Sequence, residues 1–245
     1  MKTTRILLLF FAAMLGMGVV SCDKDDNGSG NGGNNGGGNE GNGGGDSVPA
    51  GWVDLGLPSG LLWAECNLGA NNPEEYGRYY AWGETQPKDV YAWSTYCYFT
   101  VDGEGTLQTI TKYNIGSHWG VPDDLTILEA VDDAAAEALD SGARIPTKEE
   151  WQEMLSNTTE ERITLNGVTG RRYTAANGNT IFLPAAGFCW GNELLYVGYE
   201  GRYWSSSLVE DTPPAAWIFY YQWTDKGMGT FLRCGGASVR AVRQS

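Results

Sequence analysis

Histidine is almost absent from this chain, because its 245 residues include only one, His118. That scarcity excludes any site that needs two histidines, and with it most zinc hydrolases, the iron enzymes that use two histidines and a carboxylate, and histidine-rich copper sites. Positive charge is also scarce, with 16 basic residues against 30 acidic ones and a formal net charge of −14. This balance argues against nucleic acid and anionic lipid as partners.

Long hydrophobic runs are lacking as well. The apolar run over residues 6–20 follows Lys2 and Arg5, and it is too short to span a bilayer comfortably but typical of a secretory signal. It leads into Val20-Ser21-Cys22, which resembles a bacterial lipobox. We therefore expect residues 1–21 to be a lipoprotein signal peptide and Cys22 to be the lipidated residue. The alternatives are an ordinary signal peptide with a chance cysteine, or a helical anchor.

The segment after Cys22 predicts an anchor and a tether. Residues 23–26 resemble the acidic export signal of Bacteroidetes lipoproteins, which implies lipid anchoring in the outer membrane with exposure at the cell surface. Residues 27–45 comprise 11 Gly, 6 Asn, one Ser and one Glu, so they have no apolar surface to bury against the entropy of ordering. We expect a disordered tether over 22–47 and a folded domain over 48–245, which holds all 10 Trp and 13 Tyr.

The folded part shows mostly short runs with period-two apolar patterning, which predict strands. Asn166-Gly167 and Asn177-Gly178 mark turns between them. The expected strands are 52–55, 61–67, 79–82, 163–165, 172–174, 181–184, 203–206, 216–223 and 238–242.

Two segments have helical features. Apolar residues recur at helical spacing over 125–141, with Gly142 where a C-terminal cap belongs. A second helix is expected from Thr147, because Thr147 and Glu150 have the spacing of a capping box. Two helices and many strands without βαβ alternation predict an α+β fold.

Several blocks of sequence resemble a known family. Residues 144–151 (RIPTKEEW) resemble the Arg-Leu-Pro-Thr-x-x-Glu-Trp signature of the formylglycine-generating-enzyme branch of the C-type lectin fold. A closer resemblance is to a group of Bacteroidetes surface lipoprotein domains related to the Fibrobacter succinogenes major paralogous domain. The blocks that carry it are 53–64, 73–77, 80–85, 132–135, 177–187, 203–207 and 238–240. The resemblance implies a C-type lectin-like fold, with two helices packed on small twisted antiparallel sheets with long loops.

The resemblance does not extend to the residues that catalysis would need. Formylglycine-generating enzymes bind copper through a pair of nearby late cysteines, and their motif is absent around Cys189 and Cys234. The related sulfoxide synthases need an iron-binding histidine group, which one histidine cannot supply. No Ser/His/Asp set and no phosphate-binding glycine loop is credible. We therefore expect no enzymatic activity and no cofactor.

Metal binding is also not expected. The calcium-binding triplets of sugar-binding C-type lectins do not occur in the chain. The acidic pairs Asp123-Asp124 and Asp132-Asp133 could chelate a cation, but such pairs more commonly cap helices or carry solvated charge.

Four cysteines lie in the folded part: Cys66, Cys97, Cys189 and Cys234. In an exported chain they allow disulfides with three connectivities, or four buried free thiols. The resemblance favours a Cys189–Cys234 pair, because relatives commonly carry other residues at both positions.

Recognition is then the remaining role, and the aromatic-rich segment 189–233 is the candidate for it. Alternation over 216–223 puts Trp217, Phe219 and Tyr221 on one face of a strand and Tyr220 on the other, and one of these faces must be core. In relatives this stretch resembles the variable region that retroelements diversify. The resemblance makes Trp204, Ser205, Ser206 and Arg240 part of the frame. The predicted ligand-binding residues are Trp190, Asn192, Tyr196, Tyr199, Tyr220, Trp223, Asp225, Lys226 and Phe231.

The sequence therefore predicts a non-catalytic cell-surface lipoprotein that binds an extracellular protein or glycan through an aromatic surface. The alternative is a structural or assembly component of the cell envelope or of a pilus tip. A divergent formylglycine-generating-type enzyme is a third and weaker alternative.

Overall fold

The computed structural model describes residues 51–103, 108–139 and 142–245. Within them, about 40% of the residues are in strands and 12% in helical turns, and the strands form five small sheets. The chain is therefore β-rich, and the predicted α+β C-type lectin-like fold is wrong. The predicted signal peptide, Cys22 and the tether lie outside the described residues.

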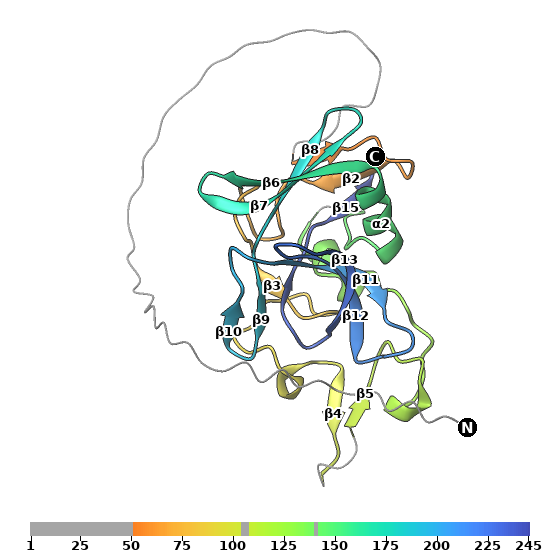
Figure 1. Cartoon of the computed structure of the whole chain (residues 1–245). Coiled ribbons are helices and arrows are strands. Elements are labelled where there is room, and N and C mark those ends of the chain that lie inside the picture. The colour runs from red at the N-terminus through yellow and green to blue at the C-terminus, as the bar shows by residue number, and fades with distance from the viewer. Residues whose placement is uncertain (1–50, 104–107, 140–141) are drawn as a thin grey trace, which may run out of the picture. The chain divides into compact units, whose positions relative to one another are not determined.

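The largest sheet has five strands and crosses the middle of the described domain (Figure 1). Its neighbours pair antiparallel except for β11 and β14, which run parallel. In spatial order it consists of β13 (Lys226–Leu232), β12 (Ala215–Tyr221), β11 (Gly201–Leu208), β14 (Ala237–Ser238) and β3 (Tyr79–Tyr80).

The four smaller sheets are antiparallel. One three-stranded sheet contains β6 (Thr158–Leu165), β7 (Val168–Ala175) and β8 (Thr180–Pro184), and the other contains β1 (Trp52–Asp54), β2 (Leu61–Ala64) and β15 (Val242–Gln244). The two-stranded sheets are β9 (Phe188–Trp190) with β10 (Glu193–Leu195), and β4 (Phe99–Val101) with β5 (Gln108–Ile110). The α-helices are α1 (Ala134–Ala138) and α2 (Lys148–Ser156), and 3₁₀ turns cover Trp93–Thr95, Ser117–Trp119 and Ala130–Asp132.

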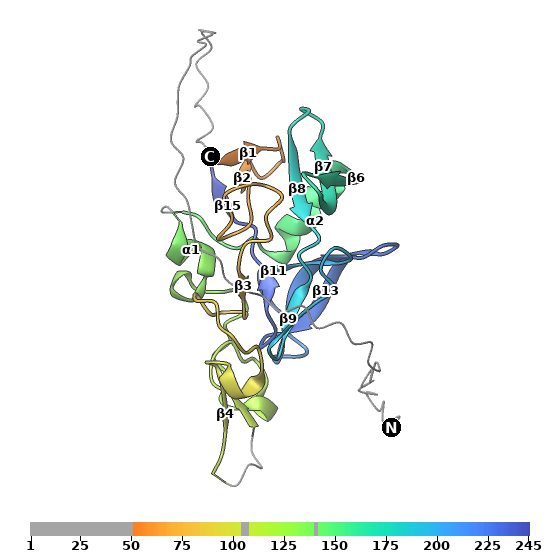
Figure 2. The same cartoon turned by 90° about the vertical axis from the view of Figure 1, so that its left-hand side faces the viewer.

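Each face of the five-stranded sheet packs against its own hydrophobic core. On one face, Tyr203 of β11 lies opposite Phe219 of β12, and Trp151 of α2 stacks on Phe219 with ring centroids 5.0 Å apart. On the other face, Trp204 pairs with Ile218 and belongs to a second core with Phe188 of β9. In the view of Figure 2, α2 lies above β11 and β9 lies below it. The alternation of β11 and β12 thus separates two cores.

The first predicted helix, residues 125–141, is mostly wrong. Its beginning is extended instead, because Leu128 donates its backbone N–H to Ser206 of β11 and Thr126 accepts from Leu208. Asp133 then starts the short α1, its carboxylate accepting from the N–H groups of Ala135 and Ala136. An aspartate that bonds N–H groups at a helix start competes with helix upstream, which the apolar spacing did not reveal.

The second predicted helix is confirmed. Thr147 is the N-cap of α2, its hydroxyl accepts from the N–H of Glu150, and the Glu150 carboxylate accepts from the N–H of Thr147. Arg144 reinforces the start, since its guanidinium makes two hydrogen bonds of 2.7 and 2.6 Å to the same carboxylate.

The strand predictions are correct in place but imprecise in extent. The Asn166-Gly167 turn is confirmed, with positive φ at both residues, although β6 and β7 extend beyond the predicted 163–165 and 172–174. The predicted strand 216–223 ends at Tyr221, and the predicted strand 238–242 is two short strands in different sheets, β14 and β15. Strands β4, β5, β9, β10 and β13 were not predicted.

Arg240 lies between β14 and β15 and is completely buried. It donates to Asn67 Oδ1 and to the carbonyl oxygens of Ala64, Glu65 and Phe182, at 2.6–3.1 Å. No carboxylate pairs with it among the described residues, and burial lowers the pKa of its guanidinium. Arg240 therefore connects β2, β8 and the C-terminal segment through neutral acceptors.

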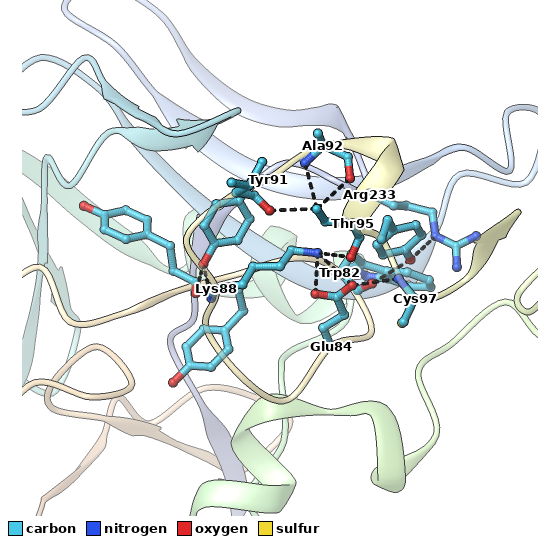
Figure 3. A network of polar contacts seen from close by, with 12 residues as sticks. Trp82, Glu84, Lys88, Tyr91, Ala92, Thr95, Cys97 and Arg233 are labelled. Atoms are coloured by element: carbon cyan, nitrogen blue, oxygen red, sulfur yellow. Dashed lines mark hydrogen bonds and ion pairs between the residues drawn. The ribbon is translucent and has the colours of Figure 1, made fainter.

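Arg233, just after β13, makes a second buried connection (Figure 3). Its Nε donates to the hydroxyl of Tyr96 at 2.8 Å, and its terminal nitrogens donate to the carbonyls of Lys112, Tyr113 and Pro213. The guanidinium also lies 4.8 Å from the ring centroid of Trp82. Three loops are thereby attached to the end of β13.

Replacing Arg240 tests how much stability this connection provides. Arg240→Ala leaves four acceptors without this donor, three of them in buried contacts, and we expect it to lower the free energy of unfolding by about 4 kcal/mol. The control, Arg172→Ala, removes an exposed ion pair to Glu161 and should cost about 0.5 kcal/mol or less. Urea denaturation measures both, and equal losses would contradict the structural role of Arg240.

Candidate functional site

The predicted ligand-binding residues lie on two neighbouring hairpins and the turn before β11. We define the hairpin surface as the four exposed aromatic side chains Trp190, Tyr196, Tyr199 and Trp223, whose exposed fractions are 39%, 57%, 67% and 65%. The β9–β10 hairpin and the 196–199 turn contribute three of them, and the tip of the β12–β13 hairpin contributes Trp223. Trp190 and Tyr196 lie over Phe231 and Phe188, whereas Trp223 lies at the opposite end of the β12–β13 hairpin from Phe231.

The turn after β10 holds Tyr196 in a fixed position. Tyr196 has a positive φ of 58°, and its carbonyl accepts from the N–H groups of Tyr199 and Glu200. Its ring stacks on Phe188, with centroids 5.7 Å apart and planes 18° from parallel. Phe188 therefore covers one face of the Tyr196 ring. Asn192 is exposed in the turn between β9 and β10.

Trp223 is supported by a cation. The guanidinium of Arg162, on β6, lies 3.3 Å from the centroid of the Trp223 ring, which is a cation–π contact. Arg171, on β7, donates to the carbonyl of Gln222 at 2.5 Å. Arg162, Arg171 and Gln222 also line a shallow recess together with Tyr199. The recess thus places Tyr199 near Gln222, the residue that precedes Trp223.

The charges beside Trp223 are arranged around one carboxylate. Glu160 of β6 makes ion pairs with both Arg171 and Lys226, and burial together with the nearby Arg171 lowers the pKa of Lys226. Asp225 accepts a 2.7 Å hydrogen bond from the hydroxyl of Tyr220, which raises the pKa of Tyr220. Asp225 and Lys226 are exposed as predicted, while Tyr220 is half-buried.

Phe231 is a correction, because it lies in the core and only 9% of it is exposed. Its ring stacks on Trp204 with centroids 5.6 Å apart and meets Phe188 edge-on at 5.3 Å. It also fills the space over Gly235, where a Cβ atom would lie 2.3 Å from the ring. Phe231 therefore supports the hairpin surface from inside and cannot contact a ligand.

Sequence reasoning missed the residues that hold the rings in place. Arg202 lies 3.6 Å from the Phe188 ring centroid and 4.6 Å from that of Phe231, and it pairs with the buried Glu200 at 2.6 Å. Arg162 was missed because its strand was predicted to start only at Ile163. The charged run 160–162 could have indicated an exposed edge strand. It could not have indicated that Arg162 contacts the Trp223 ring.

The acidic pairs are occupied by hydrogen bonds from the protein itself. Asp123 accepts from the N–H groups of Tyr113 and Asn114 at 2.7 and 2.9 Å. Although burial opposes ionisation, bonds from Lys112, Tyr113 and Tyr98 hold the pKa of Asp132 below its usual range. In the described part of the chain, no group of three or more His, Cys, Asp or Glu residues is arranged to hold a metal ion.

The predicted Cys189–Cys234 disulfide is not formed, since all four cysteines of the described residues are free thiols. Cys189 and Cys234 belong to the same hydrophobic cluster, but the backbone of Cys189 pairs with Gly236, two residues beyond Cys234. The ring of Tyr91 also packs there, where a Cβ on Gly236 would lie 2.8 Å from both that ring and Cys189. The thiols act as small apolar groups.

Burial makes these thiols weak acids. It raises the pKa of Cys189 to about 11 and that of Cys234 to about 12. Burial together with the Glu84 carboxylate raises the pKa of Cys97 to about 12. Figure 3 shows Cys97 beside Glu84, which also holds the ammonium group of Lys88.

Comparison with known proteins returned no match to a family model, to a curated protein or to a solved structure. Among the described residues, no helix is long and apolar enough to cross a membrane.

The burial of Phe231 can be tested against an exposed ring. We expect Phe231→Ala to lower the free energy of unfolding by about 3 kcal/mol, because it leaves a cavity between Trp204 and Phe188. Tyr199→Ala, at a ring exposed to solvent, should change it by about 0.5 kcal/mol or less. Thermal and urea denaturation measure both, and similar values would show that the two rings are misassigned.

The thiol assignment predicts slow alkylation. Only thiolate reacts, so the rate of the folded protein should rise about tenfold for each pH unit and show no plateau near pH 9. After unfolding without reductant, all four thiols of the domain should react, and mass spectrometry counts the adducts. Two thiols that stay unmodified after unfolding would reveal a disulfide.

Proposed function

We propose that this protein is a non-catalytic recognition module that binds an extracellular protein or glycan through the hairpin surface. The observation that carries the proposal is that four large rings are exposed and three of them rest against other groups. Tyr196 packs on Phe188, Trp190 on Phe231 and Trp223 on Arg162. Rigid, amphipathic rings offer contact area at a low cost in conformational entropy, and their faces suit both protein side chains and sugar rings.

The polar groups around the rings support the same role. Arg162 is exposed beside Trp223, and Asp225, Lys226 and Asn192 are exposed at the hairpin tips. Such groups at the rim of an aromatic centre can orient a ligand without having to be buried themselves. Hairpin tips on a packed sheet are also the usual place for binding residues.

The proposed setting is the outer face of a bacterial outer membrane. The N-terminal features that support it are the short apolar run, Cys22 and the acidic residues 23–26. A lipid anchor followed by a glycine- and asparagine-rich tether would let the hairpin surface meet an external ligand. Retention of labelled palmitate by the wild type, and its loss in Cys22→Ser, tests the anchor independently of binding.

Removing two rings tests the binding role. In cells that display the full chain, we expect Trp223→Ala combined with Tyr196→Ala to abolish capture on glycan or host-protein arrays, because each anchoring ring contributes about 2 kcal/mol. The melting temperature should stay within a few degrees of the wild type, since both rings are exposed.

The control for this experiment is Val121→Ala, which truncates an exposed side chain outside the hairpin surface. It should leave capture and the melting temperature unchanged. Undiminished capture by the double variant would contradict the proposal. A stoichiometric envelope protein co-purifying with the wild type, with no capture on either array, would favour the assembly role instead.

A further inference from the structure

The outer edge of β13 is open in its middle, between the Lys226 N–H, which donates to the Asp225 side chain, and the Leu232 carbonyl, which accepts from Gly235. β13 is the last strand of the five-stranded sheet, and all seven of its residues pair with β12 without a bulge. The hairpin closes with a 2.7 Å bond from the N–H of Gln222 to the carbonyl of Asp225. Because hydrogen-bonded pairs alternate in an antiparallel ladder, the next bonded residues of β13 are Gly227, Gly229 and Phe231.

The alternation leaves the intervening residues with their backbone groups facing outward. Met228 and Thr230 therefore direct their N–H and C=O groups away from β12. In the described part of the chain, no hydrogen bond reaches these four groups. Thr230 is exposed, and so is 37% of Leu232 at the end of the strand.

Other sheet edges carry devices that discourage pairing, whereas β13 has almost none. The edge strand β6 has three consecutive charges at 160–162, β8 ends in Pro184, and β3 has only two residues. β13 has no proline and one charge, Lys226 at its first position. A long, regular, uncharged edge is a template for another strand.

We propose that β13 pairs antiparallel with β13 of a second copy of this chain, about a two-fold axis at Gly229. Met228 and Thr230 lie one residue to either side of the axis, so the N–H and C=O groups of Met228 in each copy meet those of Thr230 in the other. The two five-stranded sheets become one continuous sheet. The closed two-fold contact leaves neither β13 edge open.

The charges and side chains of β13 favour a second copy as the occupant. The net charge of −14 repels copies from one another, but β13 contains no acidic residue. The two-fold register puts Lys226 opposite Leu232 of the second copy, where its aliphatic stem covers the exposed leucine. The two Lys226 residues are then six positions apart, about 20 Å, beyond strong repulsion in physiological salt.

A proline at position 230 tests the outward backbone groups. Thr230→Pro removes an N–H that β12 does not use, so the fold should be kept, while each copy loses one bond across the axis. We expect the dimer association constant to fall about tenfold or more. The control, Thr230→Val, keeps the N–H and should leave it within about twofold.

The register is tested by opposite charges at one exposed position. Leu232→Lys places a cation opposite Lys226 of the second copy and should weaken the dimer, whereas Leu232→Glu should strengthen it. Sedimentation equilibrium of the purified full chain, in a large excess of detergent micelles, measures all variants. Circular dichroism shows whether each remains folded, and the Leu232 pair decides the result if Thr230→Pro unfolds.

A wild type that stays monomeric at its highest soluble concentration would overturn the proposal. So would open-ended assembly instead of a dimer, or equal effects of Leu232→Lys and Leu232→Glu. None of these outcomes depends on ligand capture by the hairpin surface.

Discussion

Two guanidinium groups, those of Arg240 and Arg233, connect parts of the molecule that have no regular secondary structure in common. Both are fully buried and bonded to carbonyl, amide or phenol oxygens. A small sheet cannot satisfy the carbonyls of the loops that cross it, and buried carbonyls without donors are costly. One guanidinium supplies five donors, so each arginine serves several loops at once. This explains how sheets as short as two strands can remain attached to one another with few helices.

The hairpin surface also depends on arginine side chains that hold neighbouring parts of the chain in place. Its rings are not rigid by themselves, since each stands on a hairpin or turn at the edge of the fold. Arg202 and Arg162 support it from two sides, one against Phe188 and the other against Trp223. Phe231 links the surface to the core through Trp204. A surface supported in this way can present aromatic faces to a ligand with little ordering cost on binding.

Local signals predicted local structure well, and the errors came from contacts between distant residues. Thr147 and Glu150 specify the start of α2 because the capping box lies within four residues, and Asn166-Gly167 specifies its turn for the same reason. The helix predicted over 125–141 failed because Ser206 and Leu208, far away in the sequence, pair with its first turn. The resemblance that implied a C-type lectin-like fold failed at the level of architecture. Four of the aromatic residues predicted to bind a ligand are exposed, but which rings are exposed depends on packing, as the buried Phe231 shows.

Acidic residues are in excess over the whole chain but are absent from β13. An excess of acidic residues keeps copies of the chain apart at long range, yet the strand that follows Trp223 contains no acidic residue. Around Trp223, Arg171 and Lys226 share the carboxylate of Glu160, while Arg162 lies over the Trp223 ring. Repulsion between surfaces is screened within about 10 Å, whereas contacts between strands and rings act only at touching distance. Among the described residues, the acid-free strand β13 therefore offers a contact where repulsion at long range does not prevent short-range pairing.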